Sequence, residues 1–250
     1  MQRYFLEEIY QPDEQIILSG EAFHHIVRVM RMTPKDQVYL VFKDQLAIRA
    51  EIIEINEDAV YLIEIEKEQT QKELPNTITI ASGYPKGDKL DWIVQKGTEL
   101  GAYAFIGFPA KTSIVKWDTK KRKKRQERLK KIAQEAAEQS HRQVAPQVEL
   151  LENQQAFLEC FSSYDVVLVA YEESAKQGEL ANLAKVFKEL AVGKRILAVF
   201  GPEGGFTLEE IEVFIEKGGI LCGLGPRILR TETAPLYLLS VASYQWELDH

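Results

Sequence analysis

The sequence has few of the features that mark secreted, metal-binding or membrane-spanning proteins. It contains two cysteines, Cys160 and Cys222, which lie far apart and follow no ligand spacing. A disulfide framework or a cysteine metal site is therefore not expected. The first residues, MQRYFLEEIY, lack the apolar core of a signal peptide, and no apolar run approaches the roughly 20 residues of a membrane span. These absences predict a cytoplasmic protein that binds neither a membrane nor a metal ion.

Positive charge is scarce outside one segment. The chain has 31 Lys and Arg against 38 Asp and Glu, a formal net charge of −7. Ten of the basic residues and only two of the acidic ones lie in residues 116–131, KWDTKKRKKRQERLKK. An acidic protein that concentrates its positive charge in this way directs it at a polyanion, or presents a solvated helix face. Both interpretations stay open at this level.

The N-terminal third indicates a small β domain. Residues 36–66 contain QVYLVF, LAIRAEIIEI and AVYLIEIE, which are rich in β-branched and aromatic residues and are separated by polar breaks. The next stretch, EKEQTQKELPN, is charged, poor in apolar residues and contains a proline, as linkers are. We therefore predict a first domain at 1–70, a linker at 71–76 and a second domain at 77–250.

The second domain alternates strand and helix patterns, which is typical of an α/β fold with a mainly parallel sheet. The expected strands are 77–82, 104–109, 165–171, 195–200 and 219–225, and the expected helices are 88–100, 120–140, 179–190 and 207–217. Thr207 and Glu210 have the spacing of a capping box at the start of a helix.

The last segment, TETAPLYLLSVASYQWEL at 231–248, has Pro235 where the first turn of a helix is expected. Apolar residues then occur on almost every side of this helix. Such a helix must be buried on every side. It is either a central core helix or part of a subunit interface, and the pattern does not choose between them.

Two glycine-rich turns follow consecutive strands. The first, GPEGG at 201–205, carries Glu203 and no lysine, which argues against a nucleotide triphosphate. The second, GLG at 223–225, has Ile228 where a dinucleotide fingerprint requires glycine. Because ligands bind outside the carboxyl ends of parallel strands, the turns can wrap a small neutral or zwitterionic ligand with main-chain groups. The alternative is that both are simply tight turns.

Four motifs together resemble one protein family. GPEGGF (201–206) and LGPRILRTETA (224–234) closely resemble signature motifs of the RsmE family, SPOUT-class methyltransferases that modify 16S ribosomal RNA. KGDKLDWIVQKGTELG (86–101) and EAAEQSHR (135–142) match as well. The resemblance extends over the whole chain, and the motifs are specific in combination. His141 stands where the family often has a small residue, and we attach no function to that difference.

The resemblance implies a SPOUT-type knotted parallel sheet flanked by helices, with a C-terminal trefoil knot and a small N-terminal PUA-like β-barrel. It also implies a homodimer that binds S-adenosylmethionine and methylates N3 of a uridine in the decoding region of the small ribosomal subunit. The implied cofactor residues are Ala170, Tyr171, Phe200, Gly201, Pro202, Glu203, Gly204, Gly205, Leu224, Gly225, Ile228, Leu229 and Arg230.

The expected chemistry centres on the uridine, because N3 carries a weakly acidic proton and is occupied in base pairing. Arg230 is the first candidate for a catalytic role, since its permanent charge can stabilise a developing imide anion. Glu138 or Glu232 is the candidate proton acceptor. Glu138 and Arg142 are also four residues apart, so an ordinary surface ion pair on a helix is an equal alternative.

The basic segment leads into an amphipathic helix whose lysines are expected to contact phosphates. The predicted RNA contacts are Arg3, Arg28, Arg31, Lys86, Lys121, Lys123, Lys124, Gln139, Ser140 and Arg142. His24 and His25 are adjacent in an expected helix at 23–32 and point in different directions, which argues against joint metal binding. The alternatives are a SPOUT enzyme acting on another RNA or atom, or a non-catalytic RNA-binding factor in ribosome assembly.

Overall fold

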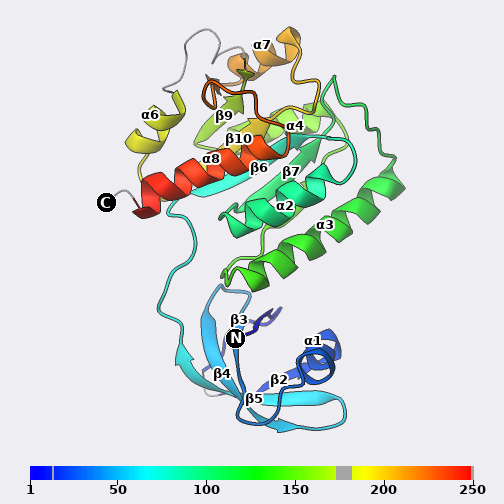
Figure 1. Cartoon of the computed structure of the whole chain (residues 1–250), viewed down its shortest axis with the longest axis vertical. Coiled ribbons are helices and arrows are strands. Elements are labelled where there is room, and N and C mark those ends of the chain that lie inside the picture. The colour runs from blue at the N-terminus through cyan, green and yellow to red at the C-terminus, as the bar shows by residue number, and fades with distance from the viewer. Residues whose placement is uncertain (13, 173–181, 249–250) are drawn as a thin grey trace. The chain divides into compact units, whose positions relative to one another are not determined.

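The computed structural model describes residues 1–12, 14–172 and 182–248 (Figure 1). Contacts within the chain divide it into two compact units. The first contains residues 1–73 and 137–145, and the second contains residues 74–136 and the chain from 146 onward. In the part of the chain that the structure describes, no helix is long and apolar enough to cross a membrane. In that same part, no three His, Cys, Asp or Glu side chains gather as metal ligands would.

The first unit is built on a curled five-stranded sheet. Its strands are β1 (Arg3–Phe5), β2 (Ile16–Ser19), β3 (Gln37–Val41), β4 (Ala47–Ile55) and β5 (Ala59–Lys67), in the order β1-β3-β4-β5-β2. The three strands predicted within residues 36–66 are confirmed as β3, β4 and β5. Because β1 and β2 are the two edges and do not pair, the sheet is a half-barrel rather than a closed barrel.

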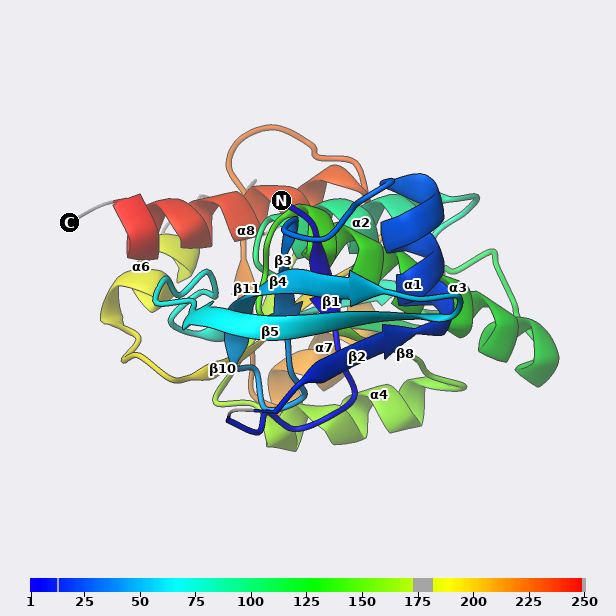
Figure 2. The same ribbon diagram turned by 90° about the horizontal axis from the view of Figure 1, so that it is seen from below.

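Helical structure in the first unit begins earlier and ends earlier than predicted. The helix α1 (Gly20–His24) lies beside β2 and continues into a π-helical turn at His25–Val29 (Figure 2). Arg31 then takes a left-handed backbone with φ 54°, which ends the helix. Arg28 and Arg31 therefore do not share one helix face, because only Arg28 lies within the helical turns.

A buried ionic cluster holds residues 137–145 within the first unit. The Arg3 side chain is fully buried, and its Nη2 donates to both carboxylate oxygens of Glu68 at 2.8 and 2.7 Å. Its Nη1 donates to the carbonyl oxygen of Arg142 at 3.3 Å. The guanidinium of Arg142 is itself buried and pairs with Glu73. The cluster thus ties β1 and the segment after β5 to the residues that follow Ala136.

Replacing Arg3 with methionine should lower the free energy of unfolding by about 3 kcal/mol, because Glu68 loses a buried partner. Denaturant unfolding measures the loss. The matched control is Arg49→Met in the same sheet. Arg49 pairs with the exposed Glu66 at 3.1 Å, so its loss should cost below about 1 kcal/mol. Unchanged stability in Arg3→Met, with weakened RNA binding, would contradict the structural role.

Stability should also depend on pH through Glu68. Burial acts to raise the pKa of this carboxyl, but hydrogen bonds from Lys72 and Arg3 outweigh it and hold the pKa below its ordinary value of 4.5. The unfolded chain therefore binds the proton more tightly. The stabilisation is present above pH 4.5 and is lost as the pH falls through the folded-state pKa. Glu68→Gln should flatten this acid dependence.

The second unit contains a six-stranded sheet in which every neighbouring pair is parallel. Its strands are β6 (Thr77–Gly83), β7 (Ala104–Phe108), β8 (Gln147–Leu150), β9 (Val166–Ala170), β10 (Arg195–Phe200) and β11 (Gly219–Cys222), in the order β11-β9-β10-β6-β7-β8. The five predicted strands are confirmed, and β8 is an additional one. With the five-stranded sheet, this confirms the predicted α/β fold, while the trefoil knot stays a prediction.

Helices cover both faces of this sheet. They are α2 (Lys89–Glu99), α3 (Thr119–Gln139), α4 (Gln154–Cys160), α6 (Asn182–Glu189), α7 (Leu208–Glu216) and α8 (Thr233–Ser243). The helix predicted at 179–190 is α6, and its positions 179–181 lie outside the described residues. Alternate residues of β10 face opposite ways: Ile196 and Ala198 pack with α2, α3, α6 and α8, whereas Leu197 and Val199 pack with α4 and α7. The α2 and α8 helices lie side by side (Figure 1).

The helix α7 begins as predicted. The Thr207 hydroxyl accepts a hydrogen bond from the Glu210 amide at 3.2 Å, and the Glu210 carboxylate accepts one from the Thr207 amide at 2.9 Å. Glu210 is buried, and its other oxygen accepts from the Lys111 amide at 2.8 Å and from Gln154 at 2.9 Å. One carboxylate therefore joins the start of α7 to α4 and to the chain after β7.

The strand order fixes where a ligand can bind. The chain leaves β6 toward α2 on one face of the sheet and leaves the neighbouring strand β10 toward α7 on the opposite face. Such a divergence between adjacent parallel strands opens a crevice at their carboxyl ends. Gly83 and Phe200 are the last residues of these two strands.

Candidate functional site

A cavity of about 550 Å³ lies at the carboxyl ends of β9 and β10. Three chain segments form most of its wall, one after each of β9, β10 and β11. Every residue that the family resemblance assigns to the cofactor lies on this wall. The wall also contains residues that the sequence did not single out, namely Lys89, Glu172, Phe206, Arg227, Thr231 and Ala234.

The turn 201–205 is closely packed at two of its glycines, Gly201 and Gly204. A Cβ at Gly201 would lie 3.1 Å from the backbone of Gly205, which itself has φ 65°. A Cβ at Gly204 would lie 2.9 Å from the Cβ of Thr112. The turn therefore needs glycine for close approach and for its left-handed position, and it presents main chain to the cavity.

The strand behind the turn has the same requirement. A Cβ on Gly83, the last residue of β6, would lie 2.6 Å from Cδ of Pro202, which is part of the cavity wall. Proline is a rigid ring close to its own backbone, so the turn rather than a flexible side chain must yield. The position of Pro202 is thus set by the absence of a side chain at Gly83.

Gly83→Ala should weaken cofactor binding about tenfold, because overpacking of this kind typically costs 1–3 kcal/mol and here displaces the cavity wall. Isothermal titration gives the affinity. Gly107→Ala is the matched control: its Cβ would lie 2.6 Å from Leu150 and 2.8 Å from Tyr84, which do not line the cavity. The control should lose stability and keep its affinity. Equal affinities for the two variants would contradict this account.

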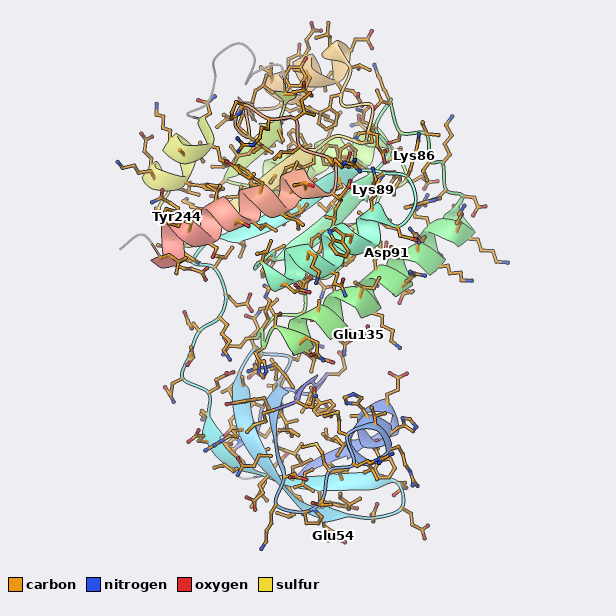
Figure 3. The ribbon with its side chains drawn as sticks, in the orientation of Figure 1. Glu54, Lys86, Lys89, Asp91, Glu135 and Tyr244 are labelled. Atoms are coloured by element: carbon orange, nitrogen blue, oxygen red, sulfur yellow. The ribbon has the colours of Figure 1, made fainter. Side chains whose placement is uncertain are left out.

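Glu203 is held by the start of α2. Its carboxylate accepts a hydrogen bond from the Lys86 amide at 3.1 Å and lies 3.0 Å from Nζ of Lys89. Lys89, which is labelled in Figure 3, also lies 3.3 Å from a carboxylate oxygen of Glu232. Lys86 thus meets the site through its backbone, while its side chain is exposed. Lys89 therefore connects the turn 201–205 to Glu232, the residue before α8.

Lys89 and Glu203 each favour the charged form of the other, as the directions of their pKa shifts show. Burial acts to raise the pKa of Glu203, but hydrogen bonds from Lys89 and from backbone amides outweigh it and lower the pKa. The pKa of Lys89 is raised, chiefly by its hydrogen bond to Glu203. Both groups therefore stay charged at neutral pH. A carboxylate within a cofactor turn is tolerated because an ammonium neutralises it.

Arg230 is an exposed cation on the cavity wall. Its carbonyl oxygen accepts hydrogen bonds from the amides of Thr233 and Ala234 at 2.9 and 3.0 Å, which fixes its backbone against the first turn of α8. Within residues 1–12, 14–172 and 182–248, its guanidinium has no acceptor. The side chain is therefore available to a ligand.

The two candidate proton acceptors belong to different units of the chain. Glu232 lies in the second unit with Arg230 and the cavity, and it pairs with Lys89. Glu138 lies in the first unit, in the segment 137–145. Arg142, which the sequence allowed to pair with Glu138, pairs with Glu73.

In the part of the chain that the structure describes, the basic helix α3 carries both paired and unpaired cations, and Lys130 pairs with Glu127 of the same helix at 3.0 Å. Its arginines pair with neighbouring acidic groups: Arg122 pairs with Glu152 at 3.3 Å, and Arg128 pairs with Asp91 of α2 at 2.7 Å. Arg125 also pairs with Asp91, at 3.4 Å. The exposed lysines Lys121, Lys123 and Lys124 have no acidic partner among the residues described. The predicted apolar stripe is confirmed, since Leu129, Ala133, Ala136 and Ala137 are buried and Ile132 is half-buried.

Burial separates the remaining predicted RNA contacts. Arg28, Arg31, Lys86 and Gln139 are exposed and Ser140 is half-buried, so these side chains can reach a partner. Arg3 and Arg142 are buried in the ionic cluster of the first unit. We therefore remove these two arginines from the predicted RNA surface, because their guanidinium groups already have carboxylate partners.

Comparisons with known proteins agree along the whole chain. An RNA methyltransferase domain matches residues 72–243, and an RNA methyltransferase PUA domain matches residues 18–65. The ribosomal RNA small subunit methyltransferase E of Bacillus subtilis is 51% identical over 251 aligned residues, which cover 99% of this chain and 98% of that protein. The enzyme of the same name from Synechocystis is 32% identical and covers 91% of this chain and 74% of its own length.

A solved structure shows the same arrangement with a ligand. The ribosomal RNA small subunit methyltransferase E of Neisseria gonorrhoeae, crystallised with S-adenosyl methionine, is 27% identical. The match covers 98% of each chain with a TM-score of 0.84.

Proposed function

The chain belongs to the family of ribosomal RNA small subunit methyltransferase E, and from this premise we propose that it methylates N3 of a uridine in the decoding region of 16S ribosomal RNA. The methyl donor is S-adenosylmethionine, and the substrate is the assembled small subunit. The observation that carries this proposal is the cavity at the strand ends, whose wall is formed largely by the glycine-bearing turns that the family motifs mark. We place the reaction in the cytoplasm.

The residues present fit this cofactor. Glycine turns let the donor approach the backbone, whose N–H and C=O groups can hold both an adenine edge and a zwitterionic amino acid. Phe200, Leu224 and Ile228 supply apolar wall. When bound, S-adenosylmethionine supplies an activated methyl group on a sulfonium that departs as a neutral thioether. The remaining difficulty lies with the uridine, which must lose its N3 proton.

We assign to Arg230 the stabilisation of the uridine after it loses its N3 proton. A base held beside the cavity mouth brings its imide group toward the guanidinium, whose fixed positive charge stabilises negative charge on the flanking carbonyl oxygens. Glu232 is the proton acceptor that belongs to the same unit, with Lys89 as its ion-pair partner. Glu138 remains the alternative acceptor. Alignment of N3 with the methyl group contributes a further several kcal/mol.

We propose that the chain forms a homodimer through its last helix. The α8 residues Leu238, Leu239 and Ala242 are buried in the core, which accounts for only one side of the helix. Another side of the helix is exposed and carries apolar residues at helical spacing, namely Tyr237 in α8 and Tyr244 and Leu248 in the π-helical turn that follows. Tyr244, which is labelled in Figure 3, has 59% of its surface exposed. An apolar face of this kind is covered in an assembly. We propose that a second copy of the chain covers it.

The test of the proposed function is a methylation map. Ribosomal RNA from cells lacking the protein is digested and analysed by mass spectrometry, and the purified enzyme is then added to small subunits from those cells. We expect one missing N3-methyluridine that the enzyme restores. A missing methyl group on another atom or on another RNA would replace the proposed target, and an unchanged map would favour a non-catalytic assembly factor.

A further inference from the structure

The loop between β7 and α3, residues 109–118, is anchored to the cofactor turn. It leaves β7 at the carboxyl end of the sheet, where the cavity lies. The hydroxyl of Thr112 donates a hydrogen bond to the carbonyl oxygen of Gly205 at 2.5 Å. The amide of Lys111 donates to Glu210, the capping residue of α7. The loop therefore holds its position relative to the turn 201–205.

The middle of the loop is extended, with alternate residues turned in and out. Val115 and Trp117 pack against the core of the second unit. Two further groups contact Trp117. The centroid of the Tyr84 ring lies 4.5 Å from that of Trp117, and the Arg125 guanidinium lies 5.5 Å from the centroid of the Trp117 ring. Ile114 is consequently held pointing outward, with 70% of its surface exposed.

The surroundings of Ile114 distinguish it from an ordinary exposed apolar residue, which by itself needs no explanation. Lys111 and Lys116 are exposed on either side of it; Lys111 pairs with Glu209, whereas Lys116 has no acidic partner in the described part of the chain. The loop then enters the basic start of α3. One exposed apolar side chain thus lies in a loop that is anchored to the turn 201–205 before it and leads into the basic start of α3 after it.

We propose, on the premise of the proposed function, that Ile114 inserts into the RNA base stack beside the target uridine. Proteins that unstack bases use apolar wedges of this kind, isoleucine among them, next to cations that hold the backbone. A base that reacts at N3 must leave its stack and its pair, which costs a few kcal/mol. An apolar group that fills the vacated space offsets that cost. Lys116 and the first lysines of α3 hold the flanking phosphates.

The occupant is RNA rather than protein because the apolar surface is one side chain wide and is bordered by positive charge. A protein interface requires a broader apolar core. The exposed face at Tyr237 and Tyr244 is the surface that fits a second copy of the chain. A change of oligomeric state on mutation of Ile114 would therefore overturn the assignment.

The first arm of the test measures single-turnover methylation of small subunits from cells lacking the enzyme. Ile114→Ala should lower the rate about tenfold, and Ile114→Met, which keeps an apolar wedge, should lower it less than about threefold. The control is Val192→Ala. Val192 is 76% exposed in the turn before β10, at the opposite end of the sheet, and its replacement should change nothing.

The second arm detects unstacking directly. Small subunits are assembled with ribosomal RNA that carries 2-aminopurine next to the target uridine, and the fluorescence is recorded as protein is added. The unmodified protein should raise the fluorescence. Ile114→Ala should bind with a Kd within about threefold of that of the unmodified protein, and it should raise the fluorescence little. An equal rise with Ile114→Ala, or no rise with the unmodified protein, would overturn this inference while methylation of small subunits still supports the proposed function. Failure of the unmodified protein to methylate small subunits would overturn both.

Discussion

Arg230→Ala should lower the single-turnover methylation rate about 100-fold or more while changing the Kd for S-adenosylmethionine by less than about threefold. Loss of one preorganised charge at a developing anion costs 10²–10³ in rate. We propose that main-chain groups of the turns hold the cofactor, so its affinity should depend little on one exposed guanidinium. Rapid-quench methylation and calorimetry measure the two quantities separately.

Arg227→Ala is the matched control for this experiment. Arg227 is an exposed arginine on the same cavity wall, three residues from Arg230, and it should be replaceable with little loss of rate. Raising the pH should recover part of the rate of Arg230→Ala, because it supplies the N3 anion without the guanidinium. A normal rate in Arg230→Ala, or a loss that high pH does not relieve, would contradict an electrostatic role.

Replacing Lys121, Lys123 and Lys124 together with glutamine should weaken binding to small subunits roughly 100-fold near physiological salt. If each lysine meets one phosphate, the slope of log K against log salt should become shallower by about two to three. The effect should be uniform across RNA sequences, since phosphate contacts give affinity and not specificity. Filter binding over a range of salt concentrations measures both quantities.

A second triple variant controls for the change in net charge. Lys185 and Lys188 on α6 and Lys217 after α7 are also exposed lysines. Their joint replacement with glutamine removes the same charge from other parts of the second unit. It should leave most of the affinity and nearly the full salt slope. Equal losses in the two triple variants would show a general charge effect, and α3 would then be only a solvated helix.

The regular elements could be predicted from the sequence where their patterns are long. The strands β6, β9 and β10 read as apolar runs because both of their faces are buried. The start of α7 could be predicted from Thr207 and Glu210, because a capping box depends only on residues that are close in the sequence. The short strands β1, β2 and β8 were not predicted, because their three or four residues are too few for a period to appear. The four-residue strand β11 was predicted as part of the longer stretch 219–225.

The glycine turns could be located, but their partners could not. GPEGG marks main chain that approaches a ligand, and the structure places that turn on the cavity wall. Lys89 meets Glu203 across more than 100 residues of sequence, and Thr112 meets Gly205 across 93. The lysine lies within a stretch that matched the family, which was the only signal for it. No local pattern pointed to Thr112.

Arg3 and Arg142 show why residue type alone misled the prediction. Arginine is usually exposed, and both lie near other charged residues in the sequence. Their carboxylate partners, Glu68 and Glu73, are 65 and 69 residues away, so only the folded chain reveals the pairs. His141, next to Arg142, has φ 59°. This left-handed backbone is adopted most readily by glycine and asparagine.

Calorimetric titration of the full chain with S-adenosylmethionine, and separately with ATP, tests most directly that the strand ends form a main-chain site for a methyl donor. The account predicts saturable binding of one S-adenosylmethionine per chain, weakened in Gly83→Ala and unchanged in Gly107→Ala, with no saturable heat from ATP. Binding of ATP in preference to S-adenosylmethionine, or no binding of S-adenosylmethionine at all, would contradict it.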